Sequence, residues 1–434
     1  MSYTVGGDEM IKPVLFVLIP FLLFSQDDMY VNDAKKYVSL LSSEEFKGRG
    51  YVQGGHLKAA SFIKDEIAGI GLEKISGSRS QEFEVEINAL ESEPRLSINA
   101  VSLRLGLDYV PHELSASGDI SSDDILSVEH GLYIPMAGIN QYQQSPRGKI
   151  VIIDNDLPKE IKKNKQTGRY ASEITRIKIA RQLGARAVIL LQDRLIFGAP
   201  YTRLDIPVFR VKKSSLPRPL KNIELEIETD IDDYDTQNVF GLLKGHAVPD
   251  SIIMLTAHYD HLGALGDSIY FPGANDNASG VALVLSLAKY FKRNPSKYSL
   301  LFVFFSGEEA GLVGSKYFQE HPRISLDKVK FLINFDMAAS AENGIMAVGG
   351  KDFPAYFNKL KAINDSLAMG KLGRRKNAAN SDHYFFIKNG MKGFYLFTKD
   401  GKQPYHHIND TYETLEWDDF SHLFKLARIF LREI

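Results

Sequence analysis

The sequence contains no cysteine among its 434 residues. This absence excludes a disulfide-bonded scaffold, a cysteine nucleophile and any metal site built on thiolates. A surplus of one charge is also lacking, because 52 Lys and Arg residues face 54 Asp and Glu residues, for a net charge of −2. This balance provides no general attraction to nucleic acid or to an anionic membrane, so we expect neither as a partner. Because cysteine is absent, any transition metal must be held by His, Asp and Glu.

Long apolar runs are missing as well. Residues 13–24 are apolar, but a bilayer core requires about 20 apolar residues, so this run is too short to span it. The run is typical of a secretory signal peptide. Asp8 and Glu9 conflict with the basic start of such a signal, and translation from Met10 would remove the conflict. We expect a signal peptide over residues 1–25, export to the periplasm or the extracellular space, and no stable membrane span after cleavage. An uncleaved anchor and a buried amino-terminal helix are the alternatives.

The remaining chain divides by pattern. Apolar residues make up 44% and charged residues 24% of the sequence, which excludes a disordered chain. Residues 32–92 contain two amphipathic helical patterns and one alternating strand pattern, and residues 217–434 alternate continuous apolar strands with helices. Such alternation predicts an α/β fold with a mostly parallel sheet covered by helices on both faces. Residues 93–216 contain short strand-like runs without a catalytic spacing of acids or histidines. We therefore predict one discontinuous catalytic domain, 32–92 and 217–434, with an inserted β-rich module.

Acids and histidines follow the predicted strands, at the ends where α/β sheets bind ligands. Each has an ordinary alternative: Glu308 and Glu309 as a solvated pair, Asp276 as a helix N-cap, and His406 as a loop residue. Together, however, carboxylates gathered at one sheet edge would repel one another, and a pair of divalent cations would relieve that repulsion. A two-metal hydrolytic site needs a bridging carboxylate, further ligands for each metal and a base. The candidate ligands are His258, Asp276, Glu309, Asp336 and His406, with Glu308 as the base. This donor set suits zinc best, with manganese and cobalt as alternatives.

Several motifs containing these residues occur in a fixed order. They are Ala257-His-Tyr-Asp-His-Leu-Gly263, Gly273-Ala-Asn-Asp-Asn-Ala-Ser-Gly280, Glu308-Glu309, Asn334-Phe-Asp-Met337, Ser381-Asp-His383 and Tyr405-His406. Successive candidate ligands are 18, 33, 27 and 70 positions apart. In these motifs and spacings the chain resembles the co-catalytic di-zinc aminopeptidases of the zinc exopeptidases, of the bacterial leucyl aminopeptidase and aminopeptidase Y type. The resemblance implies their three-layer fold, a mixed sheet between helices. Residues 93–216 resemble the protease-associated domain inserted in many members.

The resemblance also implies roles. Asp276 would bridge two zinc ions, and a cis peptide would follow it. His258 and Asp336 would complete one metal site, and Glu309 and His406 the other. Glu308 would be the general base that moves a proton from the attacking water to the leaving amine. Asp260 would accept the imidazole N–H of His258 and so fix its tautomer.

The chain departs from this pattern at one position. Ala378 stands where some relatives have a tyrosine that polarises the substrate carbonyl. His383, Tyr384, Tyr405 or one of the zinc ions would have to replace it. His407 has no role in the family.

These observations predict a secreted zinc-dependent aminopeptidase that hydrolyses the N-terminal bond of peptide or protein substrates. A carboxypeptidase of the same fold is one alternative, in which residues 374–376 (Arg-Arg-Lys) would bind the substrate carboxylate rather than form a solvated loop. A glutaminyl cyclase needs one zinc ion, and the complete five-ligand set argues against it. A non-catalytic binding or receptor-like homologue is the alternative outside enzymes, although such proteins usually lose a ligand or the base.

Overall fold

The computed structural model describes residues 26–163, 168–198, 200–399 and 404–434. The predicted signal peptide over residues 1–25 lies outside these ranges. Within them, no helix combines the length and the apolar composition that crossing a membrane requires.

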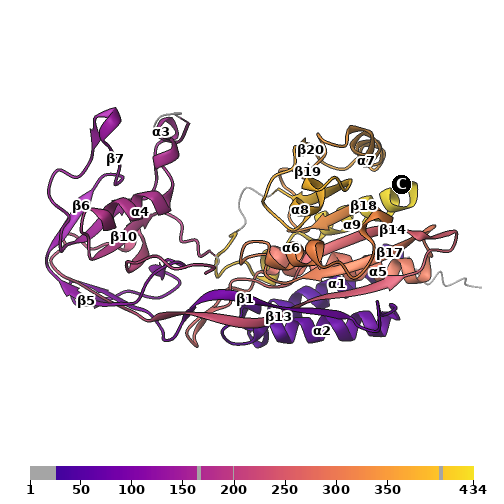
Figure 1. Cartoon of the computed structure of the whole chain (residues 1–434), viewed down its shortest axis with the longest axis horizontal. Coiled ribbons are helices and arrows are strands. Elements are labelled where there is room, and N and C mark those ends of the chain that lie inside the picture. Colours follow the sequence, from indigo (N-terminus) through magenta and orange to yellow (C-terminus); the bar gives the residue numbers. More distant parts are fainter. Residues whose placement is uncertain (1–25, 164–167, 199, 400–403) are drawn as a thin grey trace, which may run out of the picture.

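The described chain forms two lobes (Figure 1). We call residues 26–90 and 229–434 the main lobe, and residues 95–227 the accessory lobe. The long strands β1 (Ser80–Leu90) and β13 (Thr229–Leu243) run antiparallel along one side of the molecule, where the chain passes from one lobe to the other.

The main lobe is built on an eight-stranded mixed sheet, which confirms the predicted α/β fold. The pairs β17–β14, β14–β18, β18–β21 and β19–β20 are parallel, and the other neighbours are antiparallel. In spatial order the strands are β1, β13, β17 (Tyr298–Phe305), β14 (Val248–His258), β18 (Val329–Phe335), β21 (Gly393–Thr398), β19 (Ile345–Val348) and β20 (Leu372–Arg375).

Helices cover both faces of this sheet because its central strands are apolar on both sides. Phe302 and Phe304 pack into one core with α1, α2, α5 and α9, whereas Val303 and Phe305 pack into another with α6 and α8. Burying one such side chain contributes roughly 1.5–3 kcal/mol. The helices of this lobe are α1 (Gln26–Leu41), α2 (Gly55–Ile70), α5 (Gly280–Arg293), α6 (Val313–Glu320), α7 (Pro354–Ser366), α8 (His383–Lys388) and α9 (Trp417–Glu433), and a short hairpin joins β15 (Ala264–Leu265) to β16 (Ile269–Tyr270).

The accessory lobe has its own cores. Its five-stranded sheet packs one face on α4 and the other on a four-stranded sheet. The first sheet contains β4 (Tyr109–Pro111), β11 (Val208–Lys212), β10 (Ala187–Gln192), β9 (Ile150–Asp154) and β6 (Ile125–Val128); the second contains β3 (Val101–Ser102), β2 (Arg95–Ile98), β12 (Ile223–Ile227) and β5 (Gly118–Ser122). The lobe also contains α3 (Lys159–Lys163), α4 (Glu173–Gln182) and a hairpin of β7 (Tyr133–Ile134) and β8 (Ile139–Asn140).

The return to the main sheet occurs later than residue 217, where we expected it. β12 pairs with β2 and β5 in the accessory lobe, and the chain rejoins the main sheet only at β13. The reason is that β12 alternates apolar and polar residues, so its apolar face can close the small sheet. The protease-associated identity of this lobe stays a prediction.

A buried ionic cluster lies inside the accessory lobe. The Arg210 guanidinium binds the carboxylates of Glu113 and Glu173, and His112 Nε2 lies 2.9 Å from Glu173 Oε1. Burial by itself raises the pKa of both glutamates, but Arg210 and His112 outweigh burial and hold the pKa of each below its ordinary value. Glu113 also accepts the backbone N–H of Gly198 at 3.3 Å, so the cluster reaches the segment whose Phe197 stacks on Phe271 of the main lobe.

This cluster predicts a pH-dependent stability. Because the folded-state pKa of each glutamate lies below its unfolded value, the stabilisation is complete above about pH 4.5 and is lost as the pH falls further. Replacing Arg210 with Met removes the guanidinium from both carboxylates and leaves Glu173 with His112 alone. We therefore expect about 3–5 kcal/mol of destabilisation at pH 7 and a smaller loss at pH 4. Hydrogen exchange of the amides of β9 and β10 at the two pH values measures this. Arg186→Met, at an exposed arginine, is the control; an equal loss at both pH values would contradict the assignment.

Candidate metal centre

The carboxyl ends of three neighbouring strands meet at one edge of the main sheet. β14 lies between β17 and β18 and runs parallel to both. His258, the last residue of β14, pairs in register with Phe305, the last residue of β17, and Asp336 directly follows β18. Glu308 and Glu309 lie in the turn after β17. The register of the sheet therefore brings these predicted side chains together.

Asp276 and His406 reach the same edge from loops. Asp276 lies in the kinked segment Ala274–Ser279 ahead of α5, where Asp276 and Asn277 have non-helical backbone angles. The bond between them is cis, as the family resemblance implies. The Asp410 carboxylate accepts the backbone N–H of Asp276 at 3.1 Å. His406 lies in the loop between β21 and α9.

Four distances between the candidate ligand atoms fall in a narrow range. His258 Nε2 lies 3.4 Å from Asp276 Oδ1 and 3.3 Å from Asp336 Oδ1. On the other side, His406 Nε2 lies 3.3 Å from both Asp276 Oδ2 and Glu309 Oε2. Tetrahedral zinc with bonds of about 2.0–2.1 Å places neighbouring ligand atoms about 3.3–3.4 Å apart. These five residues thus fit two metal ions, with one oxygen of Asp276 turned toward each.

Ligand-type atoms also gather in two groups of three. In the part of the chain that the structure describes, His258, Glu308 and Asp336 form one group, and His261, Asp276 and Glu309 form the other, with the atoms of each group within 4.8 Å of one another. Two adjoining groups agree with a centre for two metals. His261 is a member that the sequence reasoning did not single out.

The carboxylates of this centre carry negative charge that bound cations would neutralise. Burial lowers the pKa of His258, but Asp336 and Glu308 outweigh burial and raise it well above the ordinary value. The pKa of His406 is raised in the same way by Glu309 and Asp276 against the effect of burial. Carboxylates that draw protons onto buried imidazoles would be neutralised equally well by divalent metal ions.

Glu308 lies beside His258 and Asp336, in the first of the two groups. The residue is half-buried. Desolvation of its carboxyl group, together with the charges of Glu309 and Asp336, raises its pKa well above the ordinary value, although His258 opposes the shift. A carboxyl with a raised pKa holds a proton more readily, which is the property that a group shuttling protons needs.

Asp260 makes different contacts from those we expected. We expected its carboxylate to accept the N–H of His258, but His258 Nδ1 lies 3.8 Å from Asp260 Oδ1 and bonds the backbone carbonyl of Asp260 at 3.2 Å. The carboxylate instead accepts the backbone N–H groups of Glu308 and Glu309, both at 3.3 Å, and the hydroxyl of Tyr51 at 3.0 Å. The prediction of a carboxylate–imidazole bond is therefore wrong. Asp260 fixes the turn that carries the two glutamates.

A chain of hydrogen bonds fixes Asp336. The Ser381 hydroxyl donates to Asp336 Oδ2 at 2.7 Å, which leaves Oδ1 facing His258. Asn334 Nδ2 donates to Ser381 Oγ at 2.8 Å and thereby orients the hydroxyl. The motif Ser381-Asp-His383 thus contributes to the centre through its serine.

Arg49 holds the backbone next to the centre through hydrogen bonds, and the sequence did not lead us to expect this role. Its buried guanidinium donates to the backbone carbonyls of Leu41, Tyr259, Pro272, Gly273 and Asp276. Burial lowers its pKa to about 10, although nearby Asp276 and Asp410 oppose the shift, so the side chain remains cationic at neutral pH. A Cβ at Gly48 or Gly50 would lie 2.3 or 2.2 Å from the backbone of Gly263. The sequence Gly48-Arg-Gly50 was the signal that could have pointed to Arg49.

The three side chains considered for polarising the substrate carbonyl differ in exposure and in their contacts. Tyr405 is 43% exposed as a residue, and its ring stacks on that of His406, with centroids 3.8 Å apart. His383 is fully buried against Tyr395, and Tyr384 packs against Phe385. Of these three, Tyr405 has a direct contact with a candidate ligand. His407 Nδ1 accepts the backbone N–H of Asn409 and so stabilises a turn.

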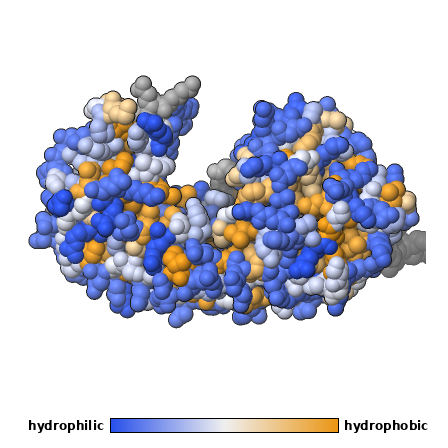
Figure 2. All heavy atoms as spheres, in the orientation of Figure 1, coloured by the Kyte–Doolittle hydropathy of each residue, from blue (hydrophilic) through white to orange (hydrophobic). Residues whose placement is uncertain are grey.

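A pocket beside the metal centre includes residues from both lobes. Phe197 and Pro200 of the accessory lobe line it together with Leu262, His261 and Glu309 of the main lobe. The backbone N–H of Phe197 donates to the carbonyl of His406 at 3.2 Å, and its ring stacks on Phe271 with centroids 5.0 Å apart. The space-filling view shows a hollow between the two lobes (Figure 2).

Comparison with known proteins finds aminopeptidases among the relatives. Aminopeptidase YwaD from Bacillus subtilis (strain 168) is 27% identical over 283 residues, 58% of each chain. Aminopeptidase Y from Saccharomyces cerevisiae is 27% identical over 237 residues, which are 49% of this chain and 42% of the relative. The match therefore spans about three fifths or less of these relatives' length.

Among solved structures, BSAP, a zinc aminopeptidase from Bacillus subtilis, has a TM-score of 0.70 at 21% identity and covers 93% of this chain and 94% of its own. This likeness confirms the fold of the whole described chain. The model of peptidase family M28 matches residues 238–431, a segment that contains all five candidate ligands and Glu308. Residues 238–431, a little under half of the chain, are thus assigned to peptidase family M28.

Proposed function

We propose that this protein is an aminopeptidase that holds two zinc ions and hydrolyses the N-terminal bond of peptides. The observation that carries the proposal is the position of Asp276, whose two oxygens lie 3.3–3.4 Å from two different histidines. Each histidine lies at the same distance from one further carboxylate, Asp336 or Glu309. The names of the relatives, an aminopeptidase YwaD and an aminopeptidase Y, support the choice of reaction. The apolar run at residues 13–24 supports export.

The chemistry follows from the positions of the chain's own side chains. When bound, the two cations would polarise the scissile carbonyl and make a water molecule more acidic. Glu308 accepts one proton from the attacking water, and the water oxygen forms the new bond to the carbonyl carbon. Glu308 then passes this proton to the amine as the peptide bond breaks. Tyr405 is our candidate for donating a hydrogen bond to the carbonyl oxygen, because its ring stacks on His406 and the residue is exposed.

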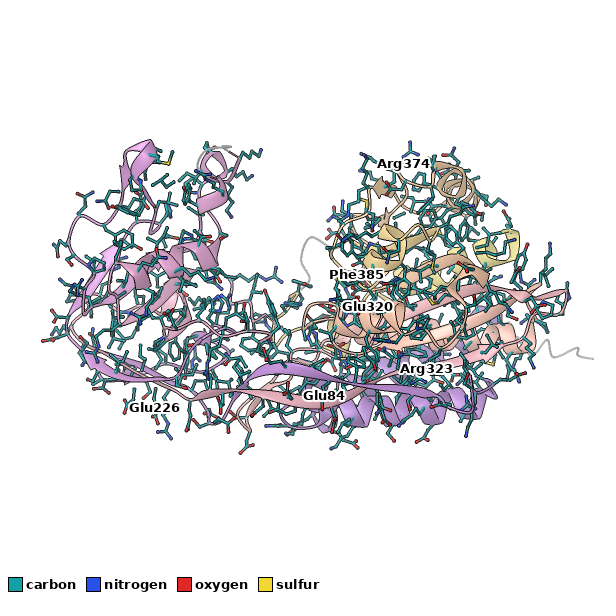
Figure 3. All side chains as sticks on the ribbon, viewed as in Figure 1. Glu84, Glu226, Glu320, Arg323, Arg374 and Phe385 are labelled. Atoms are coloured by element: carbon teal, nitrogen blue, oxygen red, sulfur yellow. The ribbon has the colours of Figure 1, made fainter. Side chains whose placement is uncertain are left out.

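Two of the three residues considered for a carboxypeptidase, Arg374 and Arg375, contact aromatic rings of the main lobe. Arg374 and Arg375 lie on β20, the strand at the edge of the main sheet. Their guanidinium groups lie over the rings of Phe357 and Phe397 at 5.0 and 5.2 Å. Figure 3 shows Arg374 at the outer end of the main lobe. These contacts favour a structural use of both arginines, so the aminopeptidase is the better supported function.

Replacing Glu308 with Gln tests the general base. The amide keeps the shape of the side chain but cannot accept the proton, so we expect kcat to fall by at least about 10²-fold while both metals are retained. Steady-state rates on aminoacyl-anilides and metal analysis of the same sample measure the two effects. Glu320→Gln, at an exposed glutamate of α6, is the matched control and should keep the normal rate. Activity of the Glu308 variant near that of the control would remove Glu308 from this role.

Metal removal tests the cofactor. We expect dialysis against a chelator to abolish turnover and lower Tm, because metal binds the folded chain and stabilises it by mass action. Adding zinc should restore both, with about two ions bound per chain at saturation. Manganese and cobalt, added separately, show whether the site accepts them. If the chain binds no metal at any of these steps, the non-catalytic binding protein is the correct function.

Blocked dipeptides test which end of the substrate is recognised. An aminopeptidase requires a free α-amine, so we expect cleavage of a dipeptide with an amidated carboxyl end and none of its N-acetylated counterpart. Product analysis by chromatography at equal enzyme concentration measures both. Cleavage of the acetylated substrate alone would identify a carboxypeptidase.

A further inference from the structure

His261 is the buried side chain at the metal centre that the proposed function leaves without a role. It follows β14 by three residues, and its residue exposure is 2%. Its backbone N–H donates to the carbonyl of Arg49 at 3.2 Å. A Cβ on Gly273 would lie 2.4 Å from the ring, so the ring fits against this glycine. Backbone and neighbours therefore hold the imidazole in one place.

The imidazole contacts one oxygen of a candidate metal ligand. His261 Nδ1 lies 2.8 Å from Glu309 Oε1, whereas Glu309 Oε2 lies 3.3 Å from His406 Nε2. An ionised carboxylate only accepts hydrogen bonds, so Nδ1 carries the proton and donates. The two oxygens of Glu309 thus have separate partners: Oε1 binds His261, and Oε2 faces the metal site.

The spacing argues against His261 as a further metal ligand through Nδ1. The ligand pairs of this centre are 3.3–3.4 Å apart, which matches two atoms on one metal. The 2.8 Å between His261 Nδ1 and Glu309 Oε1 is instead the length of a charge-assisted hydrogen bond.

The other metal site has the same design. Ser381 donates to Asp336 Oδ2 at 2.7 Å and leaves Oδ1 facing His258. In both sites a carboxylate has one oxygen fixed by a donor and the other directed at the metal. A carboxylate restrained in this way loses less rotational freedom when the metal binds.

We propose that His261 is a positioning residue, whose Nδ1–H holds Glu309 so that Oε2 binds the second metal ion. The inference rests on the proposed two-metal function and adds a residue that sets the affinity of one of the two sites. Loss of such a hydrogen bond to a ligand typically weakens metal binding about 10–100-fold.

Two substitutions of equal polarity separate the roles of the two ring nitrogens. The amide nitrogen of Asn takes the place of Nδ1, whereas that of Gln takes the place of Nε2. We expect His261→Asn to keep the affinity for both zinc ions within about 3-fold, and His261→Gln to weaken one of the two about 10–100-fold. Equilibrium dialysis against zinc buffers, followed by metal analysis, measures both affinities without relying on activity. His246→Gln, at an exposed histidine, is the control.

The outcomes separate this inference from the function on which it rests. A wild-type chain that binds fewer than two zinc ions contradicts the proposed function itself. A wild-type chain that binds two, together with a Gln variant that binds both as tightly, overturns only the role of His261. If Gln keeps the affinity and Asn loses it, Nε2 ligates the metal and the positioning role is wrong. Thermal unfolding of each variant in chelator shows that it is folded; if Gln does not fold, His261→Leu replaces it with the same expectation.

Discussion

Asp276 presents its two oxygens to two histidines on opposite sides, and the arrangement of the main lobe follows from keeping it there. The side chain is buried, and its backbone is fixed from two directions. Asp410 accepts the N–H of Asp276, and the guanidinium of Arg49 binds its carbonyl at 3.1 Å. A misplacement of Asp276 would alter both metal sites together, because the two share this one residue. The hydrogen bonds that Asp410 and Arg49 make with the backbone of Asp276 therefore help to set the geometry of both candidate metal sites.

The charge of the centre explains why so many donors surround it. Several carboxylates lie within one buried region, and each would be costly there without a partner. The structure supplies donors to the oxygens that do not face the metals: Ser381 for Asp336 and His261 for Glu309. Asp260 binds backbone N–H groups and the Tyr51 hydroxyl. Cations would then have to balance only the negative charge of the oxygens that face the candidate metal sites, such as Asp336 Oδ1 and Glu309 Oε2.

The sequence was informative where a pattern is local. Continuous apolar strands followed by acids or histidines predicted the sheet and the meeting of His258, Glu309 and Asp336, because parallel strands in register end together. It was less informative where contacts join distant segments. Tyr51 and Asp260 are 209 positions apart, and no spacing rule connects them. The hydrogen bond of His258 to a backbone carbonyl likewise depends on the path of the loop, which residue identity does not determine.

The late return of the chain to the main sheet has a similar origin. An alternating strand such as β12 fits any sheet with one apolar face, so its own residues do not select the sheet that it joins. The partners β2 and β5 decide this, and both lie far earlier in the chain, at Arg95–Ile98 and Gly118–Ser122.

The bond from Phe197 N–H to the carbonyl of His406 has a consequence for the relation between the two lobes. One peptide segment of the accessory lobe contacts the backbone of His406, a candidate metal ligand. Any free energy by which metal binding favours this position of His406 must equally favour docking of the accessory lobe, since such coupling is reciprocal. A metal ion held by His406 and the docked accessory lobe would thereby stabilise the same loop, and each would favour the binding of the other.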